Sequence, residues 1–301
     1  MGQQKIIELF QQDRPTLSFE FFPPKTRKGL EKLYDTAEQL VDLGADFFSV
    51  TYGAGGSGTG GSLEVVEGLL ERTDVPIMHH LTCFTHTFDR IREELDRMKE
   101  VGVRNIMALR GDPPADQPQF EPGPDKAHYG FELVKLIREY GDWFCVGVPG
   151  FPEGHPRAVT MDLDTTVLRV KQESGAEFCV TQLFFDNRMY FEFVKRTEAA
   201  GVHMPMVPGL LPVTDYQRLV TFCGRCGATI TENAKRVFEP IADNADEVKQ
   251  AGIDFAVLQG RELLQNGAPG LHFYCMNKVD TVRPVVEQLL GEFKRNPAPT
   301  A

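Results

Sequence analysis

Glu20 is the residue of this sequence with the clearest chemical potential, because it lies inside an otherwise apolar, strand-like run, residues 17–22 (LSFEFF). Burying a carboxylate among phenylalanines is costly unless the group is paired, hydrogen-bonded or protonated. Desolvation favours the protonated form, and a glutamate that holds its proton near neutral pH can act as a general acid. Pro23 and Pro24 end the run, which predicts that Glu20 lies at the mouth of the fold as a proton donor. A pair with a nearby lysine or arginine is the alternative.

Further polar side chains lie at or just past the ends of other apolar runs. Asp112 follows Gly111 and precedes two prolines, so it lies on a stiff turn where an ionised carboxylate could stabilise a developing positive charge. Arg110 suits a phosphate or a carbonyl edge. The remaining strand-end residues are Thr51, Tyr52, His80, Thr82, Glu153, His155, Gln182, Tyr274, Asn277 and Lys278. Any one of them could be structural, but together they predict a polar floor in an apolar mouth, the usual form of a small-molecule site.

Eight strand-like runs alternate with longer segments along the chain. The runs cover residues 17–22, 47–52, 77–83, 105–111, 144–150, 178–185, 204–211 and 271–278. Clear helical patterns cover residues 28–45, 87–103, 131–141, 165–176 and 189–202, and three of them end near a glycine, which is typical of a helix C-cap. This alternation predicts an α/β fold with a parallel sheet, best closed into a single-domain (β/α)8 TIM barrel. An open doubly wound sheet is the alternative.

The two ends of the chain are expected to differ from the barrel repeat. Residues 1–14 are expected to form a helical extension, and residues 293–301 a frayed tail. No linker rich in serine and glycine divides the sequence, which favours one domain.

Three motifs resemble known sites but are weak evidence for them. The glycine-rich stretch at residues 53–62 matches the dinucleotide pattern, yet the next strand-like run ends without the acid that this pattern requires. Cys223-Gly-Arg-Cys226 is a lone pair, whereas a zinc site needs four ligands; a redox role is possible but otherwise unsupported. His79 and His80 are adjacent, so in a strand one ring faces the helices and the other faces the barrel interior. We therefore predict no metal site.

Composition excludes several classes of partner. The 301 residues carry a formal net charge of −11 and no long basic run, which disfavours nucleic acid and anionic membranes as partners. The first fifteen residues lack the apolar core of a signal peptide, and no apolar run approaches the length of a membrane span. Six cysteines are scattered over the chain. A reduced, cytoplasmic protein is the simplest expectation.

Eight motifs, taken in order, give the chain a recognisable resemblance. They are SFEFFPPKT, SVTYGA, HHLTC, ALRGDPP, FPEGHP, VTQLFFD, PGLLPV and HFYCMNK. Over about residues 15–290 the sequence resembles the methylenetetrahydrofolate reductase family, in its bacterial form with a catalytic domain only. The resemblance implies a (β/α)8 barrel that binds FAD and reduces 5,10-methylenetetrahydrofolate to 5-methyltetrahydrofolate. It further implies NADH or NADPH as the reductant, with NADH favoured, a ping-pong mechanism and a homo-oligomer.

The resemblance also assigns roles by position. Glu20 matches the general acid that protonates folate N10, directly or through water, and Asp112 matches the carboxylate beside the flavin and the pterin. Gln182 matches a residue that contacts folate and nicotinamide, and Tyr216, Tyr274 and Lys278 are the other expected substrate contacts. The expected flavin contacts are Thr51, Tyr52, His80, Arg110, Gly111, Asp112, Tyr129, His155, Asp164 and Lys171.

Some positions depart from the family pattern. The loop at residues 53–62 lacks the usual arginine, so flavin or NADH binding is expected to be altered. Lys278 stands where relatives often have an arginine for the folate glutamate, and a lysine lacks the bidentate fork. Val167 and Val170 replace residues that are often polar on the helix facing FAD.

Two other functions are compatible with a barrel of this kind. A folate enzyme that works without flavin, such as a methyltransferase, would not need Arg110 or the Asp164 and Lys171 pair. A binding protein without enzymatic activity would have no reason to keep Glu20 among phenylalanines.

Overall fold

Nine short strands form one parallel sheet in the residues that the computed structural model describes, 3–52, 61–114 and 116–294. Residues 53–60 of the expected glycine-rich loop and most of the expected frayed tail fall outside these residues, whereas Gly61 and Ser62 begin a helix. The strands are β1 (Thr16–Phe21), β2 (Phe47–Val50), β3 (Ile77–Thr82), β4 (Asn105–Leu109), β5 (Cys145–Gly150), β6 (Phe178–Thr181), β7 (Met206–Val207), β8 (Gly209–Leu210) and β9 (Gly270–Phe273). Their order in the sheet is β7-β6-β5-β4-β3-β2-β1-β9-β8.

The sheet closes on itself at Pro208, the single residue between β7 and β8. β7 pairs with β6, whereas β8 pairs with β9 on the other side. Proline has no N–H to donate, but its carbonyl still accepts a hydrogen bond from the backbone N–H of His272 at 3.0 Å. The predicted run at 204–211 is therefore one barrel strand split in two. The predicted (β/α)8 barrel is confirmed, and the open sheet is wrong.

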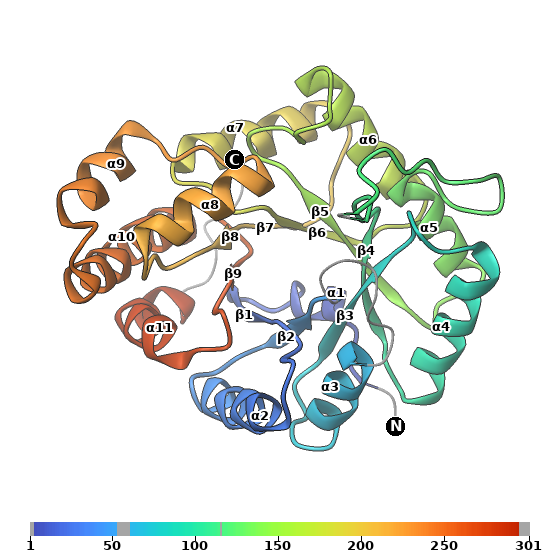
Figure 1. Ribbon diagram of the computed structural model, residues 1–301, viewed down its shortest axis with the longest axis horizontal. Helices are drawn as coiled ribbons and strands as arrows, with labels where there is room; N and C mark the ends of the chain where they lie inside the picture. Colours follow the sequence, from blue (N-terminus) through green and yellow to red (C-terminus); the bar gives the residue numbers. More distant parts are fainter. Residues whose placement is uncertain (1–2, 53–60, 115, 295–301) are drawn as a thin grey trace.

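Apart from the first, which closes one end of the barrel, the helices surround the sheet on its outer side (Figure 1). They are α1 (Ile6–Leu9), α2 (Arg27–Asp42), α3 (Gly61–Leu70), α4 (Phe88–Glu100), α5 (Gly130–Arg138), α6 (Met161–Glu173), α7 (Asn187–Ala199), α8 (Tyr216–Cys226), α9 (Glu232–Phe238), α10 (Ala245–Gln265) and α11 (Val279–Phe293), with a 3-10 turn at Glu239–Ile241. α6 begins four residues before the predicted pattern because the hydroxyl of Thr160 accepts a hydrogen bond from the backbone N–H of Leu163 and caps the helix. Among the described residues, every helix is too short or too polar to cross a membrane.

Successive side chains of β1 point to opposite faces of the sheet, and the two faces have different surroundings. Phe19 and Phe21 are fully buried between the sheet and the helices, while Ser18 and Glu20 face the barrel interior. At the amino end of the strands, the interior holds an apolar cluster that includes Phe47 and Phe178. α1 closes this end, and the backbone N–H of its Ile6 donates to Asn105 Oδ1 at 2.7 Å. The expected N-terminal helix is therefore only four residues long.

Candidate active site

Glu20 lies inside the barrel within a cluster of hydroxyl and imidazole groups. Its Oε2 atom is 3.5 Å from Ser49 Oγ, 3.5 Å from His80 Nε2 and 3.8 Å from His272 Nε2. Parallel pairing brings these residues together, because Glu20 is opposite Ser49 on β2 and Ser18 is opposite His272 on β9. The residue is buried, with 7% of its surface exposed.

These surroundings differ from the expected ones, in which phenylalanine rings enclose the Glu20 carboxyl. Phe19 and Phe21 lie on the other face of β1, so their rings are not the wall around Glu20. The recorded ion-pair partners of Glu20 within the described chain are the two histidines, with no lysine or arginine among them. Glu20 is held by groups that can both give and accept hydrogen bonds, which suits the transfer of a proton.

His272 completes the cluster and was missed from the sequence. Its Nδ1 atom is 2.9 Å from Ser18 Oγ, and its Nε2 atom is 3.3 Å from Ser49 Oγ. The ring is 1% exposed and stacks on Phe47 with centroids 5.9 Å apart. The signal was available, because His272 alternates with Leu271 and Phe273 and so shares the interior face with Tyr274.

The two adjacent histidines of β3 have separate surroundings, as predicted. His79 Nε2 is 3.1 Å from Ser62 Oγ of α3, and burial lowers the pKa of His79 to about 3. Burial also lowers the pKa of His80, although the charge of Glu20 acts in the opposite direction. His80 is therefore neutral near pH 7 and can act as a hydrogen-bonding partner of Glu20. The described residues contain no group of three or more His, Cys, Asp or Glu that could hold a metal ion.

Arg110 and Asp112 lie past the end of β4, on either side of a glycine turn. The Arg110 guanidinium lies 3.6 Å from the ring centroid of Phe84, and its Nε donates to the His128 carbonyl at 2.9 Å. Burial, reinforced by the charge of Arg157, lowers the pKa of Arg110. The side chain of Asp112 is 91% exposed, with Arg157 Nη2 3.7 Å from its Oδ1 atom. A fixed guanidinium and a solvated carboxylate thus flank one turn.

Gly111 has the backbone conformation that this turn requires. Its φ is +82°, and a Cβ added there would lie 3.0 Å from the Cβ of Thr82. Both observations favour glycine, because other residues are strained at this φ and would crowd β3.

Lys171 forms the base of a second, cationic part of the site. Its side chain is buried, and its Nζ atom approaches the Pro149 carbonyl at 3.4 Å. Burial lowers the pKa of Lys171, while the charge of Asp164 partly offsets this effect. Burial in turn raises the pKa of Asp164, which Lys171 and His155 counteract. An ammonium group with one long contact to a carbonyl is suited to an anionic ligand.

Gly130, at the start of α5, joins the Lys171 part of the site to β4. A Cβ at Gly130 would lie 3.5 Å from the Arg110 backbone nitrogen and 3.7 Å from Lys171 Cε. Next to it, Tyr129 is 56% exposed, and its ring stacks on Phe131 with centroids 5.6 Å apart. The start of α5 therefore lies against both the backbone of Arg110 and the side chain of Lys171.

Two expected site residues point elsewhere. The Tyr52 hydroxyl lies 3.0 Å from His86 Nε2 and donates to the Glu94 carboxylate on α4, so it faces the helices; alternation along β2 is the reason. Tyr216 is not in a loop but begins α8, where its ring stacks on buried Phe238. Neither side chain faces the barrel mouth.

The other predicted contacts lie at the carboxyl ends of their strands. Gln182, directly after β6, accepts a hydrogen bond from the Leu183 backbone N–H at 2.9 Å, and the Tyr274 hydroxyl donates to the Thr181 carbonyl at 2.7 Å. Lys278 is exposed just before α11. The backbone N–H of Thr51 donates to the Phe21 carbonyl, which sets Thr51 beside the end of β1.

Asn277 is the strand-end residue whose structural role is clearest. Its side-chain oxygen accepts from the backbone N–H of Phe22 at 2.9 Å, and its amide nitrogen donates to the Phe22 carbonyl at 2.7 Å. Asn277 also has a positive φ of 56°. The side chain fixes the segment just after Glu20.

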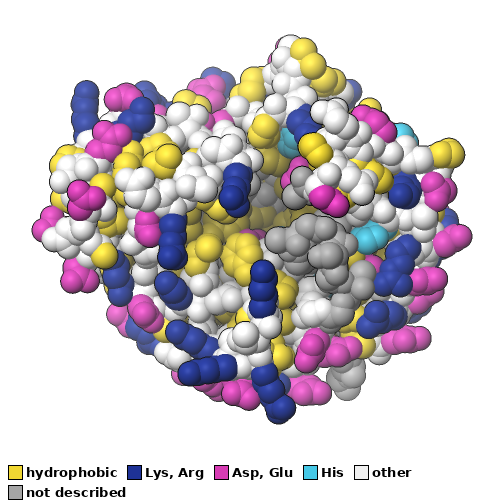
Figure 2. Space-filling model, viewed as in Figure 1, with side chains coloured by type: hydrophobic (Ala, Val, Ile, Leu, Met, Phe, Trp, Pro, Cys, Tyr) yellow, Lys and Arg dark blue, Asp and Glu magenta, His cyan; other side chains and the backbone are white. Residues whose placement is uncertain are grey.

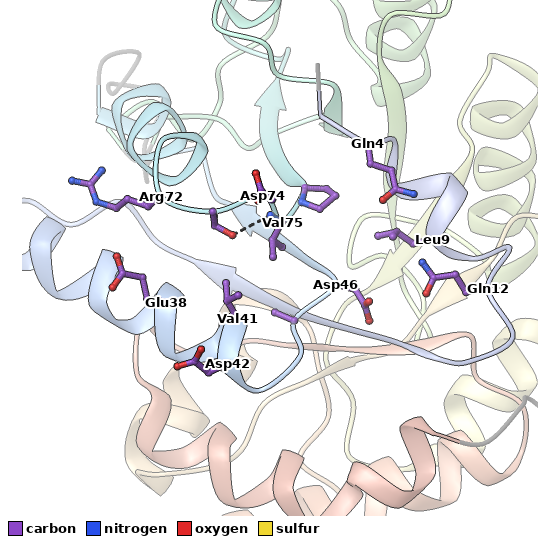
Figure 3. A pocket seen from close by; sticks show the side chains of 13 residues that line it. Gln4, Leu9, Gln12, Glu38, Val41, Asp42, Asp46, Arg72, Asp74 and Val75 are labelled. Atoms are coloured by element: carbon purple, nitrogen blue, oxygen red, sulfur yellow. Dashed lines mark hydrogen bonds between the residues drawn. The ribbon is translucent and has the colours of Figure 1, made fainter. Parts of the chain in front are cut away.

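Two hollows in the described part of the chain are candidates for a binding site. The face in Figure 2 has a hollow near its centre, where hydrophobic side chains gather over the middle of the ring of strands. A second cavity of about 570 Å³ lies at the amino ends of the strands, between α1, the end of α2 and the segment before β3 (Figure 3). One of its carboxylates, Asp46, is already paired with Arg14, whose Nη1 lies 2.9 Å from Asp46 Oδ2. Because barrel enzymes act at the carboxyl ends, we place the site around Glu20.

Sequence comparisons give one consistent family. Residues 5–290 match the family model described as Methylenetetrahydrofolate reductase. The chain is 36% identical over 283 residues to Methylenetetrahydrofolate reductase (NADH) 1 of Arabidopsis thaliana, covering 91% of this chain and 48% of that protein. It is 34% identical over 277 residues to 5,10-methylenetetrahydrofolate reductase of Pectobacterium carotovorum subsp. carotovorum, covering 92% and 90%. The chain thus spans about half the length of the plant relative and most of the bacterial one.

Solved structures with low sequence identity support the fold. An uncharacterized protein from Clostridium thermocellum that binds two copies of 5-methyl-5,6,7,8-tetrahydrofolic acid has a TM-score of 0.61 at 12% identity, covering 93% of this chain and 96% of that chain. At this identity the likeness concerns the barrel alone.

Proposed function

The chain belongs to the methylenetetrahydrofolate reductase family, and from this premise we propose that it reduces 5,10-methylenetetrahydrofolate to 5-methyltetrahydrofolate with NAD(P)H. The observation that carries the proposal is the position of Glu20, buried in a polar cluster at the carboxyl end of β1. NADH is the proposed reductant, because the name of the Arabidopsis relative specifies it. A ping-pong order, a homo-oligomer and a single catalytic domain over residues 1–301 complete the proposal.

The residues present fit FAD as the bound cofactor. Lys171, buried with one long carbonyl contact, and Arg110, fixed over Phe84, are suited to the diphosphate. The exposed Tyr129 ring provides a flat surface for an aromatic ring, and Gly111, His155 and Asp164 line the same region. The chemistry that a bound flavin supplies is transfer of a hydride from the nicotinamide to the folate.

Glu20 acts in this proposal as the proton donor to the folate nitrogen that leaves when the ring opens. The Ser49 hydroxyl donates to its carboxyl, and the imidazoles of His80 and His272 lie close to the same oxygen. General acid catalysis by a positioned side chain typically raises the rate of a reaction about 10²- to 10⁴-fold.

Asp112 has a complementary role at the rim. Its exposed carboxylate is placed to stabilise positive charge that develops on the opened folate. Gln182, Tyr274 and Lys278 lie at neighbouring strand ends and are the proposed substrate contacts. Thr51, beside the end of β1, is a proposed flavin contact.

Absorbance spectroscopy of the purified protein tests the proposal. With FAD bound, mixing with NADH under anaerobic conditions should bleach the flavin band, and methylenetetrahydrofolate should restore it with formation of 5-methyltetrahydrofolate. A protein that stays colourless when FAD is added would instead support a folate enzyme without flavin. Reduction by NADH without reoxidation by the folate would contradict the proposed substrate.

A further inference from the structure

Cys223 and Cys226 lie on one turn at the end of α8. Cys223 is 4% exposed within an apolar cluster, and Cys226 is half-buried. Both are free thiols, and Cys226 Sγ lies 3.8 Å from the Cys223 carbonyl oxygen. The one cysteine with partial access to solvent is therefore next to a buried cysteine that can react only within the protein.

Position at a helix end decides whether two cysteines three residues apart can be joined. Within a regular helix their Cβ atoms are about 5–6 Å apart, whereas a disulfide needs about 3.5–4.5 Å. Cys226 is the last residue of α8, and Gly227 follows in the left-handed conformation, with φ 77° and ψ 12°. The final turn can tighten at this point without breaking a longer helix.

We propose that Cys223 and Cys226 are a redox-active pair that forms a reversible disulfide by exchange with a low-molecular-weight disulfide such as oxidised glutathione. The sulfur of Cys226 attacks one sulfur of the small disulfide, which forms a mixed disulfide and releases one thiol. The sulfur of Cys223 then loses its proton and attacks Cys226, which closes the bond and releases the second thiol. Two protein thiols are oxidised, and one small disulfide is reduced to two thiols.

The electrostatics of the pair agree with this order of attack. A hydrogen bond from the Cys223 thiol lowers the pKa of Cys226 to about 7, and the same contact raises the pKa of Cys223. Cys226 is therefore the more acidic of the two thiols, and the thiolate is the nucleophile in exchange.

Formation of the disulfide would affect the loop after β5, because the end of α8 packs on that loop. A Cβ on Gly227 would lie 2.5 Å from Pro156 Cγ, and the backbone N–H of Thr229 donates to Glu153 Oε1 at 3.1 Å. The cap itself is held by a 2.9 Å hydrogen bond from the Gly227 N–H to the Cys223 carbonyl. Drawing the two Cβ atoms together disturbs this cap, so oxidation loosens the contact between α8 and residues 151–157.

Peptide mapping tests the disulfide directly on the whole folded chain. After incubation with oxidised glutathione, alkylation and trypsin, peptides 219–225 and 226–235 should be recovered as one linked species that separates on reduction. Cleavage after Arg225 lies between the two cysteines, so only a disulfide can join these peptides. The buried cysteines Cys83, Cys145, Cys179 and Cys275 serve as internal controls and should stay unlinked. Absence of the linked species, while an alkylating agent labels Cys226, would overturn the proposal.

Two single variants test the order of attack. Cys223→Ser should accumulate the glutathione adduct on Cys226, because no second thiol resolves it. Cys226→Ser should lose modification of peptide 219–225. Modification of Cys223 in Cys226→Ser at the wild-type rate would show that the assigned nucleophile is wrong.

Hydrogen exchange of the oxidised and reduced wild-type protein tests whether the disulfide loosens the contact between α8 and residues 151–157. Oxidation should speed exchange at residues 226–229 and 151–157 and leave α2 unchanged. Equal exchange at 151–157 in both states would refute the coupling to the loop. None of these measurements depends on the proposed reductase activity.

Discussion

The Nε2 atom of His80 lies 3.5 Å from the Oε2 atom of Glu20, across the carboxyl ends of β3 and β1. Among the described residues this nitrogen makes no hydrogen bond, so the approach is close without hydrogen-bond geometry. A small movement of either side chain would form the bond.

Glu20→Gln should separate the two halves of the reaction. The amide fills the same space but cannot donate an acidic proton, so we expect folate reduction to fall about 10²- to 10⁴-fold. Flavin reduction by NADH should stay near the wild-type rate, as measured by stopped-flow absorbance. Glu94→Gln is the matched control, since Glu94 is 6% exposed but faces Tyr52 on the helix side. Equal folate reduction in Glu20→Gln and wild type would remove Glu20 as the acid.

Lys171→Met should weaken FAD binding about 10- to 100-fold, because it removes a charged hydrogen-bond donor to a phosphate. The protein without FAD should be as stable as wild type or more stable, because methionine removes a buried charge. Titration by flavin fluorescence and urea unfolding measure the two effects, with Lys195→Met as an exposed control. Unchanged FAD affinity would contradict the assignment.

Tyr52→Phe should affect stability and leave FAD binding unchanged. The hydroxyl donates to buried Glu94, and losing it leaves that carboxylate short of a donor, at a cost of about 1–3 kcal/mol in the free energy of unfolding. Urea unfolding and the FAD titration test this prediction. Tyr140→Phe is the control, because the Tyr140 hydroxyl bonds to Asp96 at a more exposed position and should cost less. Weaker FAD binding in Tyr52→Phe would show that Tyr52 contributes to the cofactor site after all.

His79 should make the protein less stable in acid. Its pKa falls from an ordinary value of about 6.5 in the unfolded chain to about 3 in the fold. Between these values the unfolded state binds one more proton, so stability falls as the pH drops, by about 1.4 kcal/mol per pH unit for this group. His79→Gln should therefore lose about 2 kcal/mol less than wild type between pH 6.5 and pH 5.

Urea unfolding at the two pH values measures this difference. His203→Gln, at an exposed position, is the control and should keep the wild-type dependence on pH. If His79→Gln lost as much stability as wild type, another group would have to account for the acid sensitivity.

Local patterns in the sequence determined much of this protein. Eight apolar runs between amphipathic segments predicted the barrel, and the strand ends pointed to Glu20, Arg110 and Asp112 as candidates. Alternation also separated His79 from His80. The separation of the two histidines holds because side-chain direction in a strand depends only on the neighbouring backbone.

Tertiary structure decided what depends on contacts between distant segments. The pairing of β1 with β9, about 250 residues apart, brings His272 to Glu20 and replaces the supposed phenylalanine wall with hydroxyl and imidazole groups. The start of α8 at Tyr216, whose ring stacks on Phe238, was likewise unavailable from spacing alone. The register between strands is set by packing of the whole barrel, and no short stretch of sequence contains that information.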